Sequence, residues 1–291
     1  MSIPANAERA VLRSRIAWLP LGRLADLGGI AILAVKALRA LIRPSPNSPP
    51  LVPAVMGQMT WMLAMGIPLV GLVHLSFGSF LAMQAYFGAT FTEGAGAVVG
   101  VGLIRNVAPL LSGFILAGLI AVKVTSDLRG GLRPGLDDRR SVPDRDVLQG
   151  ARPDDRPRPD AGRVALARLL AAAISGPVLA AWGVAVGTTM GLLVTKSMLG
   201  QSPAIFLGKI AEMLRPVDVA GMVVKGAGFA AMAALISTFE GLRHDRDGGP
   251  DTYRAVFRSI FMILFLNFTW FNLVYLASDP FGPDVAAAPA G

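Results

Sequence analysis

The sequence has 291 residues, of which 53% are hydrophobic and 16% are charged, and its mean hydropathy is +0.56; this composition excludes an ordinary soluble domain and indicates a polytopic membrane protein. Cysteine is absent, which excludes disulfides, thiolate metal sites and cysteine nucleophiles. The net charge is +8, but the arginines concentrate between apolar segments, so we assign this charge to membrane orientation and to anionic lipid and expect no nucleic-acid partner.

Residues 1–50 are predicted to form a cytoplasmic N-terminus that contains an amphipathic helix from Trp18 to Ile42. Its charged residues Lys36, Arg39 and Arg43 share one face, which is typical of a helix that lies in the membrane interface. A tilted sixth span is the alternative. Prolines between residues 44 and 50 end the helix. The apolar positions that recur at three- and four-residue steps are Leu21, Leu24, Gly28, Ala31, Val35, Leu38 and Ile42.

Residues 51–291 are predicted to form one domain with five membrane spans. The first span begins at Leu51, and residues 51–91 contain no Asp, Glu, Lys or Arg, although a span needs only about 20 apolar residues. We expect a kink at Pro68. His74 lies in the middle of this span with no second histidine or carboxylate near it in sequence, so we interpret it as a helix-packing donor rather than a proton relay.

Four further apolar segments complete the set: about Ala97–Val124, Leu169–Thr195, Val219–Phe239 and Ser259–Ala277. The third span is uncharged, and its glycines at 176, 183, 187 and 191 predict close helix packing. A polar connector separates the third span from the fourth. In the fifth, Trp270 and Tyr275 are predicted to be interfacial anchors.

The informative polar residues inside the spans are Arg105 and Asn106 in the second span and Lys225 in the fourth. Charges at this depth cost at least a few kcal/mol and usually face a cavity or a paired helix. These residues are therefore candidates for a substrate path or a subunit interface. The alternative for Arg105 is that it snorkels, because it lies about two turns from the end of its span.

Residues 127–163 form a hydrophilic loop rich in arginine, aspartate and proline. Within it, residues 141–150 carry a capping Ser141, a first-turn Pro143, early acids and a closing Gly150, which together predict a helix of about two turns. A short capped helix between two spans is suited to docking on a cytosolic partner. A solvated turn without a partner is the alternative.

The distribution of charge predicts the orientation. With the N-terminus inside, 21 of the 27 lysines and arginines fall in inner segments, and only Lys196, Lys209 and Arg215 fall in outer connectors. The positive-inside rule then places the N-terminus in the cytoplasm and the C-terminus outside.

No catalytic motif is present in the sequence. It contains no G-x-x-x-x-G-K-[ST] phosphate loop, no H-E-x-x-H and no G-x-S-x-G. We therefore expect this chain not to be an enzyme, to hold no metal or cofactor, and to leave any ATP hydrolysis to another subunit. A membrane-embedded lipid enzyme is a remote reading because no acid/base pair is evident.

The second span carries a resemblance to a known family. The stretch LIRNVAPLLSGFILAGLIAVKVTSDL resembles the signature of MlaE/YrbE-type permeases, the membrane subunits of lipid-transporting ABC systems that work with MCE-domain proteins. Arg105, Pro109, Ala117-Gly118 and Asp127-Leu128 match it. Upstream, FLAMQAYF resembles the family's L-x-L-Q-x-Y, and Asp144-x-Asp146-Val147-Leu148 resembles its coupling motif E-I-D-A-L.

The resemblance implies an all-α integral membrane permease, with an elbow helix and five spans, in the cytoplasmic (inner) membrane. It also implies a cytosolic ABC ATPase that binds the ATP, an MCE-domain protein on the periplasmic side, a second permease copy or sister permease, and a lipid such as phospholipid as cargo. The lipid-path candidates are Gln84, Tyr86, Arg105, Asn106 and Lys225. The ATPase-coupling candidates are Asp127, Arg129, Asp144, Asp146, Val147 and Leu148.

Several positions depart from the family pattern. The acid that follows the signature arginine is Asn106 here, the A-G-R arginine is Leu119, and the first glutamate of the coupling motif aligns with Pro143. The connection to the coupling motif is also longer. These departures motivate a second hypothesis, a degenerate, non-transporting structural or regulatory subunit of a hetero-oligomeric MCE complex.

Overall fold

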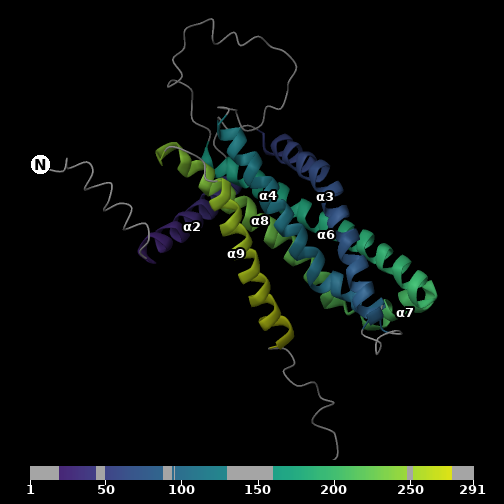
Figure 1. Cartoon of the computed structure of the whole chain (residues 1–291). Coiled ribbons are helices and arrows are strands. Elements are labelled where there is room, and N and C mark those ends of the chain that lie inside the picture. The colour runs from purple at the N-terminus through teal and green to yellow at the C-terminus, as the bar shows by residue number, and fades with distance from the viewer. Residues whose placement is uncertain are drawn as a thin grey trace, which may run out of the picture.

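We describe the protein from a computed structural model, which covers residues 20–43, 50–87, 94, 96–129, 160–247 and 252–276. Every secondary-structure element in these ranges is a helix, and five of the helices are long and apolar enough to cross a membrane (Figure 1). The all-α membrane fold is thus confirmed. The elements are α2 (Pro20–Ile42), α3 (Leu51–Phe87), η1 (Ala97–Val101), η2 (Leu103–Val107), α4 (Ala108–Arg129), α6 (Ala161–Leu199), α7 (Pro203–Met213), α8 (Pro216–Asp247), α9 (Thr252–Phe271) and η4 (Asn272–Leu276).

Helix α2 packs against one end of the bundle and is not among the five candidate spans. It buries Leu33, Ala37 and Ala40 against α6 and α8. The predicted apolar positions Val35 and Leu38 lie on the opposite side and are exposed. The helix therefore has two apolar faces, one for the protein and one available to lipid, as expected of an interfacial helix. The apolar positions picked out by sequence periodicity, Val35, Leu38 and Ile42 among them, belong to the exposed face.

The bundle core is built around α6, which packs along α3 on one side and α8 on another. All four predicted glycines of α6 lie against a neighbour: a Cβ atom at Gly176 would meet the backbone of Gly226, and one at Gly187 would meet Leu103 and the backbone of His74. Small residues let helix backbones approach closely where no hydrophobic driving force between helices exists. The predicted close packing is confirmed.

His74 of α3 is completely buried, and its ring lies against Gly183 of α6. The Nδ1 atom donates a hydrogen bond to the Val70 carbonyl one turn earlier, at 2.8 Å. This arrangement confirms the interpretation of His74 as a packing residue, because the ring fills the space that the glycine leaves open.

Helix α6 is longer than predicted, since it begins at Ala161 rather than near Leu169. Asp160 caps its N-terminus by accepting a hydrogen bond from the Gly162 amide, and Gly200, with φ of 62°, ends it. The prediction placed Arg163 in the loop of residues 127–163 and began the span only after Arg168. Arg168 is instead buried within the helix, where an ion pair compensates its charge.

The polar connector between the third and fourth spans contains a helix, α7, which the sequence analysis did not predict. Ser202 caps this helix by accepting a hydrogen bond from the Ile205 amide, and Pro203 occupies its first turn. Phe206 is fully buried against η1, η2 and the end of α3. Ser202 followed by Pro203 was the sequence signal for the start of this helix.

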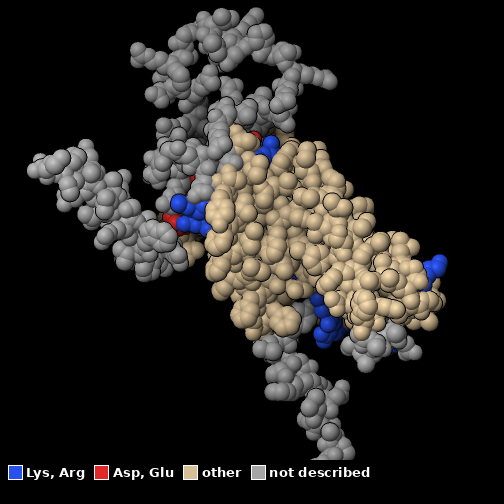
Figure 2. Space-filling view, viewed as in Figure 1, with Lys and Arg blue, Asp and Glu red and all other residues tan. Residues whose placement is uncertain are grey.

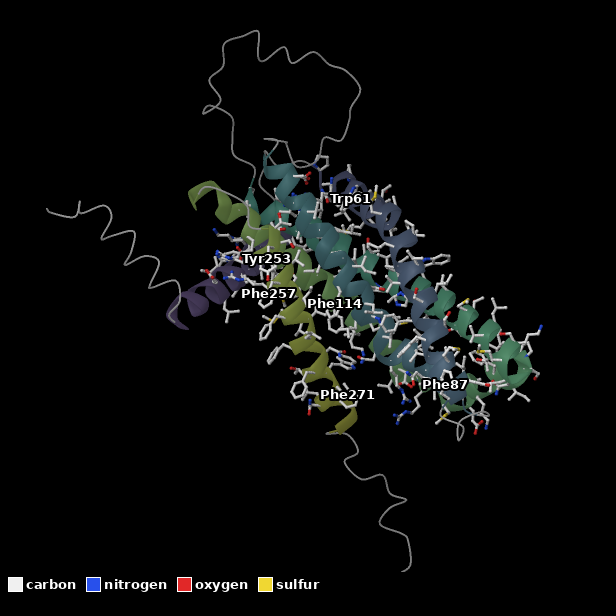
Figure 3. The ribbon with its side chains drawn as sticks, in the orientation of Figure 1. Trp61, Phe87, Phe114, Tyr253, Phe257 and Phe271 are labelled. Atoms are coloured by element: carbon white, nitrogen blue, oxygen red, sulfur yellow. The ribbon has the colours of Figure 1, made fainter. Side chains whose placement is uncertain are left out.

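Helix α9 is the least covered of the five candidate spans. Tyr253, Phe257 and Phe271 are exposed along it (Figure 3), whereas Ile263 packs on α4 and α8. The ring of Trp270 lies beside Gly221 of α8, so it packs inward, and the side chain of Tyr275 lies outside the described residues. Figure 2 shows a broad face without charged side chains, bordered by lysines and arginines near the ends of the bundle, as a membrane span requires.

Candidate functional site

The polar residues of the second and fourth spans meet at one end of the bundle, and we call Arg105, Asp218 and Lys225 the Arg105 cluster. The guanidinium of Arg105 donates to both carboxylate oxygens of Asp218, from Nε at 2.8 Å and from Nη2 at 3.0 Å. This two-bond geometry is the strong form of an arginine–carboxylate pair. The Asp218 side chain is 0% exposed and that of Arg105 is 35% exposed, so the pair reaches the surface only through the arginine.

Local structure positions Asp218. It lies in the first turn of α8, behind Pro216, where the helix dipole favours an anion. One carboxylate oxygen also accepts a hydrogen bond from the Arg215 amide at 2.9 Å. The carboxylate is thereby held by a backbone amide on its own side and by a guanidinium from η2.

Lys225 is two turns further along α8 and is also buried. Its ammonium donates a hydrogen bond to the backbone carbonyl of Arg105, within the π-helical segment η2. π-Helical turns inside longer helices occur often at functional sites because they alter the backbone hydrogen bonding. The Arg105 cluster therefore binds both the side chain and the backbone of Arg105 to α8.

The other predicted lipid-path residues are on the surface. Asn106 is exposed beside Arg105, and Gln84 and Tyr86 are exposed in the last turn of α3. Tyr86 makes an edge-to-face contact with Phe87, with ring centroids 5.2 Å apart. The last turns of α3 and the π-helical segments belong to one end of the bundle, because Ala82 and Leu103 share a core cluster. None of these residues lines the apolar groove of about 300 Å³ between α3 and α6.

A second cluster lies at the opposite end of α4 and consists of Lys123, Asp127 and Arg168. The Asp127 carboxylate accepts from Nη2 of Arg168 at 3.2 Å, and Lys123 Nζ lies 3.6 Å from its other oxygen. The pair joins the last turns of α4 to the first turns of α6. Asp127 was predicted to take part in coupling. The side chain of Arg129 and all of Asp144, Asp146, Val147 and Leu148 lie outside the described residues.

A third cluster joins the elbow helix to the bundle. Arg258 of α9 donates to Glu240 of α8 and to Asp26 of α2. Glu240 is buried, and the other two side chains are partly buried. One arginine thereby links three helices. In the part of the chain that the structure describes, no group of three His, Asp or Glu residues is arranged to hold a metal ion.

Comparison with known proteins shows which permeases the chain is similar to. A model of the family described as permease MlaE matches residues 160–272. The chain is 25% identical over 253 residues to a probable ABC transporter permease protein of Rickettsia bellii, covering 84% of this chain and 91% of the relative. Over residues 160–272 the chain is similar to the MlaE permease family, and these relatives are named as probable ABC transporter permeases. A similar protein of Synechocystis is 26% identical over 210 residues, covering 71% of this permease and 74% of the relative.

Sequence reasoning missed the acidic partners in this permease. It named Arg105 and Lys225 but not Asp218, which pairs with the arginine 113 residues away. The sequence signal was an acid two residues after Pro216 at the start of a span, where a first-turn carboxylate is favourable. It also missed Arg168, Glu240 and Arg258 as paired residues. These pairings carry no local sequence signal, because each partner lies on a different helix.

Proposed function

We propose that this MlaE-type permease is the membrane subunit of an ABC-type lipid transporter, with phospholipid or another membrane lipid as cargo. The relatives are named probable ABC transporter permeases, which supports the permease assignment. The match to the permease MlaE family carries the proposal. Since the sequence has no phosphate-binding loop, a separate cytosolic ABC ATPase binds and hydrolyses the ATP, and the permease itself is not an enzyme.

The lipid path in this proposal runs past the end of the bundle that holds the Arg105 cluster. The exposed third of Arg105 offers a cation to a lipid headgroup, and Tyr86 and Asn106 are exposed at the same end. Gln84 and Lys225 complete the candidate set. A headgroup needs polar groups and an acyl chain needs an apolar wall, and this end of the permease supplies both.

The complete transporter would contain further subunits. A second permease copy or a sister permease pairs with this chain, and an MCE-domain protein receives or delivers lipid on the periplasmic side. The exposed aromatic face of α9 supports the pairing, because it is an apolar surface that no described helix of this chain covers.

The proposed test uses the purified complex. If residues 141–150 dock on the ATPase, the double substitution Asp144→Arg and Leu148→Asp should release the ATPase and abolish ATP-dependent lipid transfer between vesicles. A charge reversal at the exposed Glu212 of α7, Glu212→Arg, is the matched control and should retain the ATPase. Unchanged ATPase association in the double variant would favour the alternative function, a degenerate structural or regulatory subunit.

The proposed orientation, with the N-terminus in the cytoplasm and the C-terminus outside in the inner membrane, is testable because the chain has no cysteine. A membrane-impermeant maleimide should label Glu212→Cys in intact cells with the outer membrane opened. It should label Ser141→Cys only after the inner membrane is permeabilised. Labelling of Ser141→Cys from outside would overturn the orientation and the docking proposal together.

A further inference from the structure

The hydrophilic segment between the second and third spans is flanked in the sequence by the end of α4 and the start of α6. Asp127 lies in the last turn of α4, and Arg168 lies in the third turn of α6. We call these two helix ends the stems of the segment. An interaction between Asp127 and Arg168 therefore connects the stems directly, whatever lies between them in sequence.

The connecting pair is buried. The Arg168 side chain is 3% exposed and that of Asp127 is 18% exposed, with 3.2 Å between Nη2 and Oδ2. Nη1 of Arg168 is also buried and has no hydrogen-bond partner in the described part of the chain. Leaving a buried charged donor with incomplete hydrogen bonding is unfavourable, so the single pair with Asp127 carries much of the compensation for this buried cation.

The pair belongs to a network that reaches α3. Lys123, one turn before Asp127, lies near the carboxylate and places its ammonium 5.0 Å from the centre of the Trp61 ring. The stem arginine Arg163 is oriented differently: its Nη1 donates to the Ala40 carbonyl of α2, at 3.3 Å. Within the stems, Arg168 rather than Arg163 joins α6 to α4.

Resting on the proposed function, we propose that Asp127 and Arg168 are positioning residues for transport, which join the two stems so that a displacement of the coupling segment moves α4 and α6 together. Asp127 acts through Arg168 and not by touching the ATPase. Because α4 follows directly on η2 in one continuous span, such a movement would reach Arg105 at the opposite end of that span. If the two stems moved separately, ATP would be hydrolysed without moving the helices that border the lipid path.

The first experiment is a double-mutant cycle in the complex with its ATPase, reconstituted in vesicles. Asp127→Asn and Arg168→Gln should each lower the unfolding temperature, because each leaves a buried group without its partner. The double variant should recover much of the lost stability, since both charges are gone. The number of lipids transferred per ATP hydrolysed should nevertheless stay at least about fivefold below wild type in the double variant, the size of a coupling of about 1 kcal/mol.

The control is Arg163→Gln, which removes an arginine from the same stem without touching α4 and should transfer lipid at nearly the wild-type yield per ATP. Recovery of both stability and transfer yield in the double variant would overturn the proposal and leave the pair a purely structural one. A wild-type complex that transfers no lipid would instead overturn the proposed function.

A second measurement does not depend on the variants being stable. Spin labels at Ser126→Cys on the α4 stem and Ile174→Cys on α6, both exposed positions, report the separation of the stems in an otherwise unaltered chain. The distance distribution should be the same in the nucleotide-free and ATP-bound complexes, because the pair holds the stems together. A shift of several Å between the two states would overturn the proposal.

Discussion

Gly78→Ala is expected to destabilise the permease strongly, whereas Gly57→Ala on the same helix should make it slightly more stable. A Cβ atom at Gly78 would overlap the backbone carbonyl of Gly187 in α6, and no atom lies within 4 Å of the corresponding position at Gly57. The backbones of α3 and α6 are fixed by their helical hydrogen bonds, so neither can shift away from the added Cβ atom as a flexible side chain could.

The size of the effect follows from two opposed contributions. Alanine is favoured over glycine in a helix interior by about 1 kcal/mol, which is the whole expected change at Gly57. At Gly78 the overlap should outweigh this gain, with a net loss of about 2 kcal/mol or more from overpacking. The unfolding temperature in detergent, measured for both variants, checks the prediction. Equal behaviour of the two variants would mean that the α3–α6 contact is looser than the structure has it.

Substitutions in the Arg105 cluster should have unequal effects on stability. Arg105→Met is expected to cost about 3 kcal/mol, because it leaves the carboxylate of Asp218 buried without its guanidinium. Asp218→Asn should cost only about 1 kcal/mol, because Arg105 is 35% exposed and can turn its charge to water or to lipid headgroups. The order of the two losses depends on which partner is desolvated.

The neighbouring lysine does not remove this difference. Lys225 interacts electrostatically with Asp218, but its ammonium is bonded to the backbone carbonyl of Arg105, which both variants keep. The double variant Arg105→Met with Asp218→Asn should be more stable than Arg105→Met alone, since the carboxylate that lost its guanidinium is then also removed, while Lys225 keeps its hydrogen bond to the Arg105 carbonyl. Chemical unfolding in detergent gives the three free energies. A larger loss for Asp218→Asn than for Arg105→Met would show that the arginine, not the carboxylate, is the desolvated partner.

The prediction of the fold succeeded where the physics is local. The five spans, the interfacial helix α2 and the glycine contacts of α6 were all readable from segments of about 20 residues. Crossing a membrane requires each segment to satisfy its own backbone and to be apolar along its length, and both requirements are written into the segment itself. The prediction was less accurate for helix ends that lie near charged or capping residues: α6 begins earlier than predicted, and α7 was not predicted.

The sequence by itself determined that this chain is an all-α membrane protein that resembles MlaE-type permeases, because hydrophobic length and the motif around Arg105 are contained within single helices. Only the tertiary structure decided what the charges do: that Arg105 binds Asp218, that Asp127 faces Arg168 rather than solvent, and that Arg258 joins three helices. Such pairings depend on which helices become neighbours and in what register. In a low-dielectric interior that register decides whether a buried charge is compensated, and no single segment contains it.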